Sequence, residues 1–523
     1  MNPSPAIDRS LVVLSTTLIT VMVLITGVMA VYVLSDPGLK PAYRLIAAAI
    51  RIDESHYETV DHGRLITSAR QAMMDRLDRF SNFVTPSRFR QMHELQSGSY
   101  SGIGVSVVRD EMGLLIMSVR ENGPADEAGF LTGDIIITAD SSRLCQLSLQ
   151  DASELLRGKE GTSVTVELYR PISDDTLQAV LTRSRIPFVH VPYAGYTMDS
   201  ILYVRLLDFD PGASDEVKAA LDSLIPDNGP VPSGIILDLR GNPGGLFSEA
   251  CETADLFLQE GVFVVGTDGR SRWNEERFYA TGEDLTGDLP MTVITDGGTA
   301  SAAEIVAGAL QQAGRAVLVG DTTFGKGLVQ GYIRFLDGNG LRLTISRYFF
   351  KGDVYLNDFD STLEDIGHGL VPDYYFRFDV QRHFPQALEN SRLLRQFAIS
   401  CQNEIIAASE RPGLDSSWTE RFLRFTEESG FEYRSAQTEI AGYIADLTGD
   451  KDYHRETRET AGKLLSLTLS NDRQQFFANS DYIETRLKQI AYQRKYSTSR
   501  AYKEVVVPDF KAIRFASDII LDK

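Results

Sequence analysis

Between residues 186 and 378, short apolar runs alternate with helix-forming segments, and this alternation constrains the fold more than any other feature of the chain. The runs SGIILDLRG, MTVITDGG and AVLVGD each end in glycine or aspartate, whereas SEACETADLFLQEG and SAAEIVAGALQQAG have the composition of helices. Strand–helix–strand alternation predicts an α/β core with a largely parallel sheet. We expect its active groups on loops at the carboxyl ends of the strands.

The rest of the chain predicts further domains, because 523 residues exceed what one hydrophobic core usually supports. Short strands with glycine-rich turns and one amphipathic helix predict a small domain at residues 98–185, followed by the core at 186–380. A helical segment at 38–97 should pack on that core. The helical region at 381–523 holds no catalytic constellation, so we expect it to serve packing or homo-oligomerisation.

The first 37 residues predict a membrane anchor. Leu11–Leu34 carries no charge over 24 residues, and as a helix it would span about 36 Å, enough to cross a bilayer. The alternative is a signal peptide cleaved after Ala30, although the apolar part of such peptides is usually roughly 7–15 residues long. We therefore expect an N-terminal transmembrane helix at residues 1–37, a single-pass protein of the inner (cytoplasmic) membrane, and a bulk that faces the periplasm or cell exterior.

Charge and cysteine content narrow the classes of partner. The formal net charge of −20 disfavours a nucleic-acid partner, which would need clustered lysine and arginine. Cys145, Cys251 and Cys401 lie far apart and have neither metal-ligand spacing nor a disulfide framework. We expect no metal and no organic cofactor.

The segment GDTTFGKGLVQ, residues 320–330, invites two interpretations. Gly320, Gly325 and Lys326 fit a phosphate-binding loop, but Gly327 stands where that loop needs a hydroxyl for magnesium. The following LVQGYIRF is typical of a strand, whereas a phosphate loop must run into a helix. A nucleotide site is therefore a remote alternative, and Lys326 is either a surface lysine or a group with another chemical role.

Ser301 begins a helix-forming segment, where first-turn N–H groups lack partners. It is either an ordinary helix N-cap or a nucleophile whose developing oxyanion the Ala302 N–H would hold. A nucleophilic serine needs a base, and none of the seven histidines lies within sixty residues of it. Lys326 follows 25 residues later, just past the next strand. If an apolar site keeps its amine neutral, Lys326 can be that base, with Gln330 holding the amine by a hydrogen bond.

Upstream, LDLRGNPGG at residues 237–245 predicts a strand that ends in a glycine-rich turn. Such a turn exposes backbone N–H groups that can hold an anion, so it could complete an oxyanion hole with Ala302. An ordinary turn is the alternative.

Taken in order, DLRGNPGG, TASAAEIVAGALQQAGRAVLVGDTTFGKGLVQ, DGNGLRLTISRYFFKGD and HGLVPD resemble the carboxy-terminal processing (tail-specific) serine proteases. The resemblance runs from about Pro41 to Asp373. It implies a crotonase/ClpP-like α/β protease core, with a PDZ domain inserted between the helical segment and that core.

The resemblance also implies roles for single residues. Ser301 would be the nucleophile, Lys326 the general base and Gln330 the residue that positions the lysine. The oxyanion donors would be the backbone N–H groups of Ala302 and of a glycine in NPGG, with Gly245 preferred over Gly244. The family usually reads S-A-S-E around the nucleophile, whereas this chain reads S-A-A-E, so an alanine replaces the second serine.

The small domain resembles a PDZ module in SYSGIGVSV, GPADEAGFLTGDIIITADSSRL and LQDASELL. A peptide would add as a strand beside IGVSV, and its last apolar side chain would enter a pocket from ASELL. Its terminal carboxylate would meet the N–H groups of the loop formed by Ser101, Gly102, Ile103 and Gly104. For SGIG in isolation, a tight turn is the alternative.

Together these features predict a membrane-anchored serine endopeptidase that cuts exported proteins near their carboxyl termini and binds their exposed tails. The main alternative is a non-catalytic PDZ adaptor on a degenerate protease scaffold.

Overall fold

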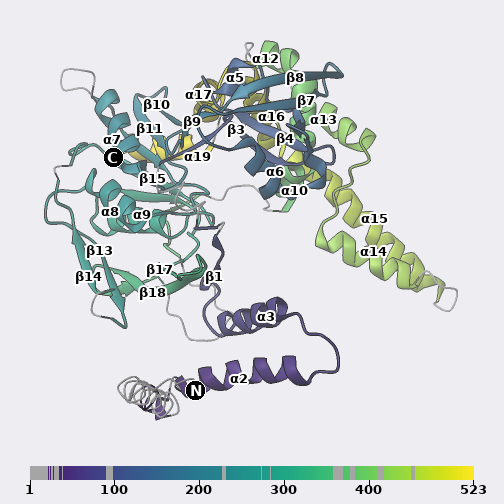
Figure 1. The fold of residues 1–523 in the computed structure, drawn as a ribbon. Coiled ribbons are helices and arrows are strands. Elements are labelled where there is room, and N and C mark those ends of the chain that lie inside the picture. The colour runs from purple at the N-terminus through teal and green to yellow at the C-terminus, as the bar shows by residue number, and fades with distance from the viewer. Residues whose placement is uncertain are drawn as a thin grey trace, which may run out of the picture. The chain divides into compact units, whose positions relative to one another are not determined.

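Figure 1 shows the fold of the chain as a computed structural model. The residues it describes are 20, 22, 24, 28, 35–37, 39–86, 88–89, 98–225, 231–271, 274–282, 284–356, 369–376, 383–409, 417–448, 454–509 and 511–522. The chain divides into two units, one of residues 1–84 with 332–343 and the other of residues 85–331 with 344–523.

The described residues of the first unit include helices and a short strand pair. Its elements are α2 (Leu39–Ser55), α3 (His62–Met74), β1 (Asn82–Val84) and the start of β18 (Gly340–Phe350). The Asp61 carboxylate caps α3 by accepting the Arg64 N–H at 3.1 Å. β1 pairs antiparallel with β18 and places Asn82 opposite Arg342.

The predicted transmembrane helix covers Leu11–Leu34, and most of these residues lie outside the described part of the chain. In the part that is described, no helix is both long and apolar enough to cross a bilayer. α2, the first helix with described bounds, has 17 residues and carries charges of both signs, among them Lys40, Arg44 and Glu54. The described residues thus contradict the predicted transmembrane helix and, with it, the predicted location in the inner membrane.

Residues 99–187, in the second unit, form a small antiparallel β-domain. Its elements are β2 (Ser99–Gly102), β3 (Val105–Arg109), β4 (Leu114–Val119), α5 (Pro124–Glu127), β5 (Ile135–Ala139), β6 (Ser142–Arg143), η1 (Leu144–Gln146), α6 (Leu149–Leu156), β7 (Ser163–Arg170), β8 (Asp175–Thr182) and β9 (Ser184–Pro187). The strand order is β3-β4-β5-β7-β8, and β2 pairs with β9. Alternate residues of β7, namely Val164, Val166 and Leu168, are buried in the domain core, as their period of two predicts.

The second unit is built around a six-stranded sheet. Its strands are β10 (Tyr193–Tyr196), β11 (Ile201–Arg205), β12 (Gly234–Asp238), β15 (Met291–Thr295), β16 (Val317–Gly320) and β20 (Tyr374–Tyr375), and its helices are α7 (Ala213–Leu224), α8 (Phe247–Asp255) and α9 (Ala302–Gln312). Neighbouring strands from β11 to β20 are parallel, and only the pairing of β10 with β11 is antiparallel among these described strands. This is the largely parallel sheet that the strand–helix alternation predicted.

Both faces of this sheet are covered. Residues that alternate along the strands pack with α7, α8 and α9 in one cluster, among them Leu202, Val204, Ile235, Leu237 and Val293. The residues between them pack in a second cluster with Ile513 and Ile520 of α19 (Lys511–Leu521). Near-continuous apolar strands are therefore required, because each strand is buried on both sides.

A second sheet lies against α9. Its elements are β13 (Phe263–Gly269), β14 (Glu276–Tyr279), β17 (Leu328–Arg334), β19 (Val354–Tyr355) and the end of β18. β13 pairs with β18 so that Gly266 is opposite Phe349. The ring of Phe350 contacts Gly308 in α9, where a Cβ would lie 2.4 Å from a ring carbon.

The described residues between 383 and 509 are mostly helical. They form α10 (His383–Ser391), α11 (Leu393–Ser400), α12 (Gln402–Ser409), α13 (Ser417–Glu428), α14 (Ala436–Thr448), α15 (Arg455–Ala478), α16 (Ser480–Lys495), α17 (Thr498–Ala501), η3 (Tyr502–Val506) and α18 (Val507–Asp509). Aromatic rings of four helices, Phe384, Phe397, Phe422 and Phe476, meet in their core.

Candidate active site

Ser301 is the N-cap residue of α9, directly after the turn at 296–300 that follows β15. Its backbone has φ of +57° and ψ of −118°, a conformation that a non-glycine residue rarely adopts. Residues 302–310 behind it are buried, whereas its own side chain is half-buried. Strained conformations of this kind persist only where the surroundings hold them, and they cluster at active sites.

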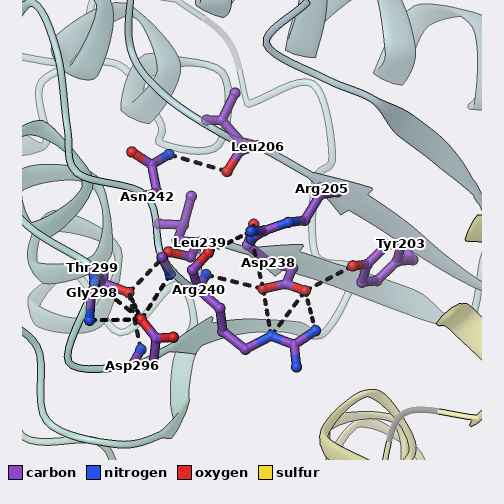
Figure 2. A network of polar contacts seen from close by, with 11 residues as sticks. Tyr203, Arg205, Leu206, Asp238, Leu239, Arg240, Asn242, Asp296, Gly298 and Thr299 are labelled. Carbon is purple, nitrogen blue, oxygen red and sulfur yellow. Dashed lines mark hydrogen bonds and ion pairs between the residues drawn. The ribbon is translucent and has the colours of Figure 1, made fainter. Parts of the chain in front are cut away.

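Asp296 holds the turn that leads to Ser301. Its Oδ1 accepts the N–H groups of Gly241 at 2.8 Å, Gly298 at 2.9 Å and Thr299 at 3.1 Å, as Figure 2 shows. The Thr299 hydroxyl donates to the carbonyl of Leu239 at 2.9 Å. The loops that follow β12 and β15 are therefore tied together at the carboxyl ends of these two parallel strands.

Glu304, in the first turn of α9, joins Ser301 to the loop that carries Lys326. Its Oε2 accepts the N–H of Ser301 and the N–H of Lys326, each at 2.8 Å. Its Oε1 accepts the Gly325 N–H at 2.6 Å and the Thr323 hydroxyl at 2.5 Å. The two predicted catalytic residues thus lie on either side of one carboxylate oxygen, although 25 residues separate them in the chain.

The Glu304 side chain is completely buried. Burial raises its pKa, while the hydrogen bonds from Thr323 and from the backbone of Lys326, Gly325 and Ser301 act in the opposite direction. Glu304 is not among the residues predicted from the sequence. The available signal was a glutamate three positions after an N-cap serine, which is the spacing of a capping box.

Gly244 and Gly245 end the turn after β12, where Gly244 lies beside Ser301 and Gly245 lies against the backbone of Phe209. A Cβ on Gly244 would lie 2.8 Å from both the Ser301 Cβ and the Ala302 nitrogen. The Gly244 N–H already donates to Asn242 Oδ1 at 2.9 Å. The Gly244 N–H is therefore already engaged, and the choice of Gly245 and Ala302 as oxyanion donors stays a prediction.

Lys326 lies in the loop between β16 and β17, two residues before β17 begins at Leu328, and its side chain is half-buried. Because its loop runs into a strand, the phosphate-loop alternative lacks the helix N-terminus that it needs. Gln330 lies within β17 and is half-buried as well. Its role toward Lys326 stays a prediction.

A buried charge network fixes the end of β12, where the glycine-rich turn begins (Figure 2). The Asp238 carboxylate accepts hydrogen bonds from the Tyr203 hydroxyl at 2.7 Å, Arg205 Nη1 at 3.1 Å and Arg240 Nε at 2.9 Å. Burial by itself would raise the pKa of Asp238, but the Arg240 and Arg205 guanidiniums outweigh it and hold that pKa well below its usual range. The sequence patterns did not identify this network. The available signal was the presence of charged residues at the end of an otherwise apolar strand.

The four predicted peptide-binding residues lie where β2 ends and β3 is about to begin. Ser101 and Gly102 belong to β2, and Gly104 has φ of +79°. The side chain of Ile103 is 1% exposed and belongs to the core of the β-domain, so only its backbone can face a peptide. The Gly104 carbonyl accepts the Arg120 N–H at 2.8 Å, which holds the loop.

Comparison with known proteins gives this arrangement a family. The family model for peptidase family S41 matches residues 200–366, and that for a PDZ domain matches residues 101–181. The carboxy-terminal-processing protease of Bartonella bacilliformis is 32% identical over 331 residues, which are 62% of this chain and 75% of that protein. The chain belongs to peptidase family S41.

Two further relatives of this S41 peptidase come from a plant and from another bacterium. Carboxyl-terminal-processing peptidase 2, chloroplastic, of Arabidopsis thaliana is 34% identical over 52% of this chain and 54% of its own length. Carboxy-terminal processing protease CtpA of Bacillus subtilis is 31% identical over 58% of this chain and 64% of its own length. The predicted family, the PDZ domain and the assignment as a serine-type peptidase are confirmed.

Proposed function

We propose that this S41 peptidase is an endopeptidase that cleaves protein substrates near their carboxyl termini with a Ser301–Lys326 dyad. One observation carries the proposal: Ser301 and Lys326 donate their N–H groups to the same Glu304 oxygen, each at 2.8 Å. The names of the relatives, which are carboxy-terminal processing proteases, support the class of substrate.

In the proposed reaction, the neutral Lys326 amine takes the proton of the Ser301 hydroxyl while Oγ attacks the scissile carbonyl carbon. The resulting oxyanion accepts hydrogen bonds from the N–H groups of Ala302 and Gly245. The carbon–nitrogen bond then breaks, and Lys326 gives its proton to the leaving amine. Gln330 holds the lysine amine between these steps.

A water molecule completes the cycle. Lys326 takes one proton of the water as its oxygen attacks the acyl carbon, and the acyl–oxygen bond to Ser301 breaks. The proton returns to Ser301, and the new carboxylic acid leaves and loses its own proton to the solvent. The reaction uses no metal and no organic cofactor.

The β-domain, residues 98–185, would bind the substrate tail. We propose that the N–H groups of the Ser101–Gly104 loop hold the terminal carboxylate and that the peptide pairs with β3. The catalytic core would be 186–380.

The helical region at 381–523 would mediate homo-oligomerisation. α14 supports this proposal, because Ile440, Tyr443 and Leu447 recur at helical spacing on it and are each more than half exposed. Sedimentation of the wild type and of Tyr443→Glu would test it, and a monomeric wild type would exclude it.

The decisive test of the dyad is digestion of an unfolded protein by the wild type, Ser301→Ala and Lys326→Ala. Both variants should lose at least 10³-fold in rate, since removing one member of such a unit costs on this order. Arg421→Ala, a change on α13, is the control and should cleave normally. Equal cleavage by all four proteins would contradict the proposal.

The tail-binding role needs a separate substrate pair. A peptide with a free terminal carboxylate should show a lower KM than the same peptide with a terminal amide. Gly104→Val should remove that difference, because it strains a position with φ of +79° that holds the loop. A non-catalytic PDZ adaptor would show the opposite dependence, needing Gly104 but not Ser301.

A further inference from the structure

Tyr348, in the second half of β18, contacts both members of the proposed dyad. Its hydroxyl donates to the Lys326 carbonyl at 2.7 Å and lies 3.3 Å from the Ser301 carbonyl. Its own N–H donates to the Gly327 carbonyl at 3.0 Å. The 2.7 Å contact with the Lys326 carbonyl has the length of a good O–H···O hydrogen bond. The 3.3 Å contact with the Ser301 carbonyl is a weaker hydrogen bond of the same hydroxyl.

Tyr348 and Glu304 contact the same two residues with opposite hydrogen-bonding character. Glu304 accepts the N–H groups of Ser301 and Lys326, whereas Tyr348 faces their carbonyl groups as a donor. Glu304 belongs to α9, and Tyr348 comes from the second sheet, 47 residues beyond Ser301. Helix α9 therefore holds the backbone N–H groups of the dyad, and strand β18 holds its carbonyl groups.

The Tyr348 hydroxyl stays protonated and can always donate a hydrogen bond. The side chain is 1% exposed, and burial together with the negative charge of Glu304 raises its pKa well above the usual value. It therefore keeps its proton over the working range of pH. Phe350, two residues further on the same strand, packs edge-on against it and has no hydroxyl, so packing by itself does not require one here.

We propose that Tyr348 is a positioning residue, which sets the distance between Ser301 Oγ and the Lys326 amine by holding the two backbones that carry them. It does so without touching the substrate. This role rests on the proposed dyad. A phenylalanine at this position would keep the packing and would leave the Lys326 carbonyl without its buried donor.

The expected effect falls on the chemical step. Displacement of a reacting group by about 1 Å can reduce a rate on the order of 10²-fold. Tyr348→Phe should therefore lower kcat by about 10- to 100-fold, with KM within about twofold of the wild type. A loosened lysine in the site should also move the acidic limb of the pH–rate profile to higher pH, because the amine would be less desolvated.

The control is Tyr482→Phe in α16, which removes another tyrosine hydroxyl that donates a hydrogen bond. Tyr482 is half-buried, donates to the carboxylate oxygen Glu389 Oε1 at 2.9 Å, and lies outside the dyad. It should lose some thermal stability and keep the kcat and the pH profile of the wild type. If Tyr348→Phe changes only stability, as Tyr482→Phe does, the positioning role is overturned.

If Tyr348→Phe does not fold, two replacements of similar size can still test the role of the hydroxyl donor. 4-Fluorophenylalanine at position 348 fills the volume of the hydroxyl without a donor, and 4-aminophenylalanine restores a donor. The amino form should cleave at least five times faster than the fluoro form, and equal rates would overturn the proposal. Ser301→Ala in the same assay separates the two claims: cleavage that does not depend on Ser301 would defeat the dyad, and this role with it.

Discussion

Gly244 has a backbone conformation that favours glycine, and it lies so close to Ser301 that a side chain would not fit. Its φ is +93°, and a Cβ there would lie 2.8 Å from the Ala302 nitrogen. Gly244→Ala should therefore lower kcat/KM by at least 10²-fold, the usual effect of disturbing an oxyanion donor, and cost roughly 1–3 kcal/mol of stability.

Gly241→Ala is the control for this change. Gly241 lies in the same loop with φ of +64°, and nothing lies within 4 Å of its Cβ position. The variant should show the loss of stability and keep most of the activity. Equal loss of activity in both variants would mean that strain, and not the space beside Ala302, matters.

His190 makes stability depend on pH at the start of the core. The ring is 3% exposed and its Nδ1 lies 2.6 Å from Asp208 Oδ1. Burial lowers its pKa, but the hydrogen bond and charge of Asp208, with Glu216 and Asp210 nearby, outweigh this and raise it above 6.5. The charged pair therefore stabilises the fold fully below about pH 6.5, and this contribution is lost as the pH rises through the folded pKa.

Thermal melts of the wild type and His190→Gln should thus differ most below about pH 6.5, on the order of 1 kcal/mol, and approach each other as the pH rises through the folded pKa. His454→Gln, at an exposed histidine, is the control. A gap that widens as pH rises would contradict the assignment.

At the scale of elements, α19 matters most, because the end of the chain covers one face of the central sheet. Ile520 is 3% exposed, and a Cβ on Gly234 of β12 would lie 2.5 Å from its Cγ2. Ile520→Ala should lower the free energy of unfolding by about 2–4 kcal/mol in urea titration. The neighbouring Leu521→Ala, at a residue 53% exposed, should change it by less than about 0.5 kcal/mol. Similar values for both would show that α19 does not pack there.

The elements that the sequence could predict are those whose signal is local. Strands of the core, the helix after Ser301 and the turn at Gly244 follow from apolar runs, helix formers and glycine. Tyr348 and α19 could not be found in this way, because the Lys326 carbonyl and the central sheet that they contact lie 22 or more residues away and no local pattern distinguishes them from ordinary strand or helix. The predicted transmembrane helix rested on one uncharged apolar run, and no described helix is long and apolar enough to bear it out.

On the scale of the whole molecule, arginines of the helical region contact the PDZ domain within the second unit. Arg392 Nη1 lies 2.7 Å from Asp110 Oδ2, and Arg395 Nη1 donates to the Met117 carbonyl at 2.9 Å. Arg392 has φ of +63°, so a strained backbone presents this side chain. The PDZ domain is therefore held by a charge pair as well as by its link to the core.

Arg392→Asp should loosen this contact, since like charges would then face each other across it. Loss of about 1 kcal/mol corresponds to roughly fivefold faster hydrogen exchange in β3 and β4. The double reversal Asp110→Arg with Arg392→Asp should restore slow exchange, because the pair is re-formed with opposite polarity. Arg421→Asp, which breaks the 2.9 Å pair with Glu404 inside the helical region, should leave β3 and β4 unchanged. If the double reversal exchanges as fast as the single variant, the arginine holds the domain by packing and not by charge.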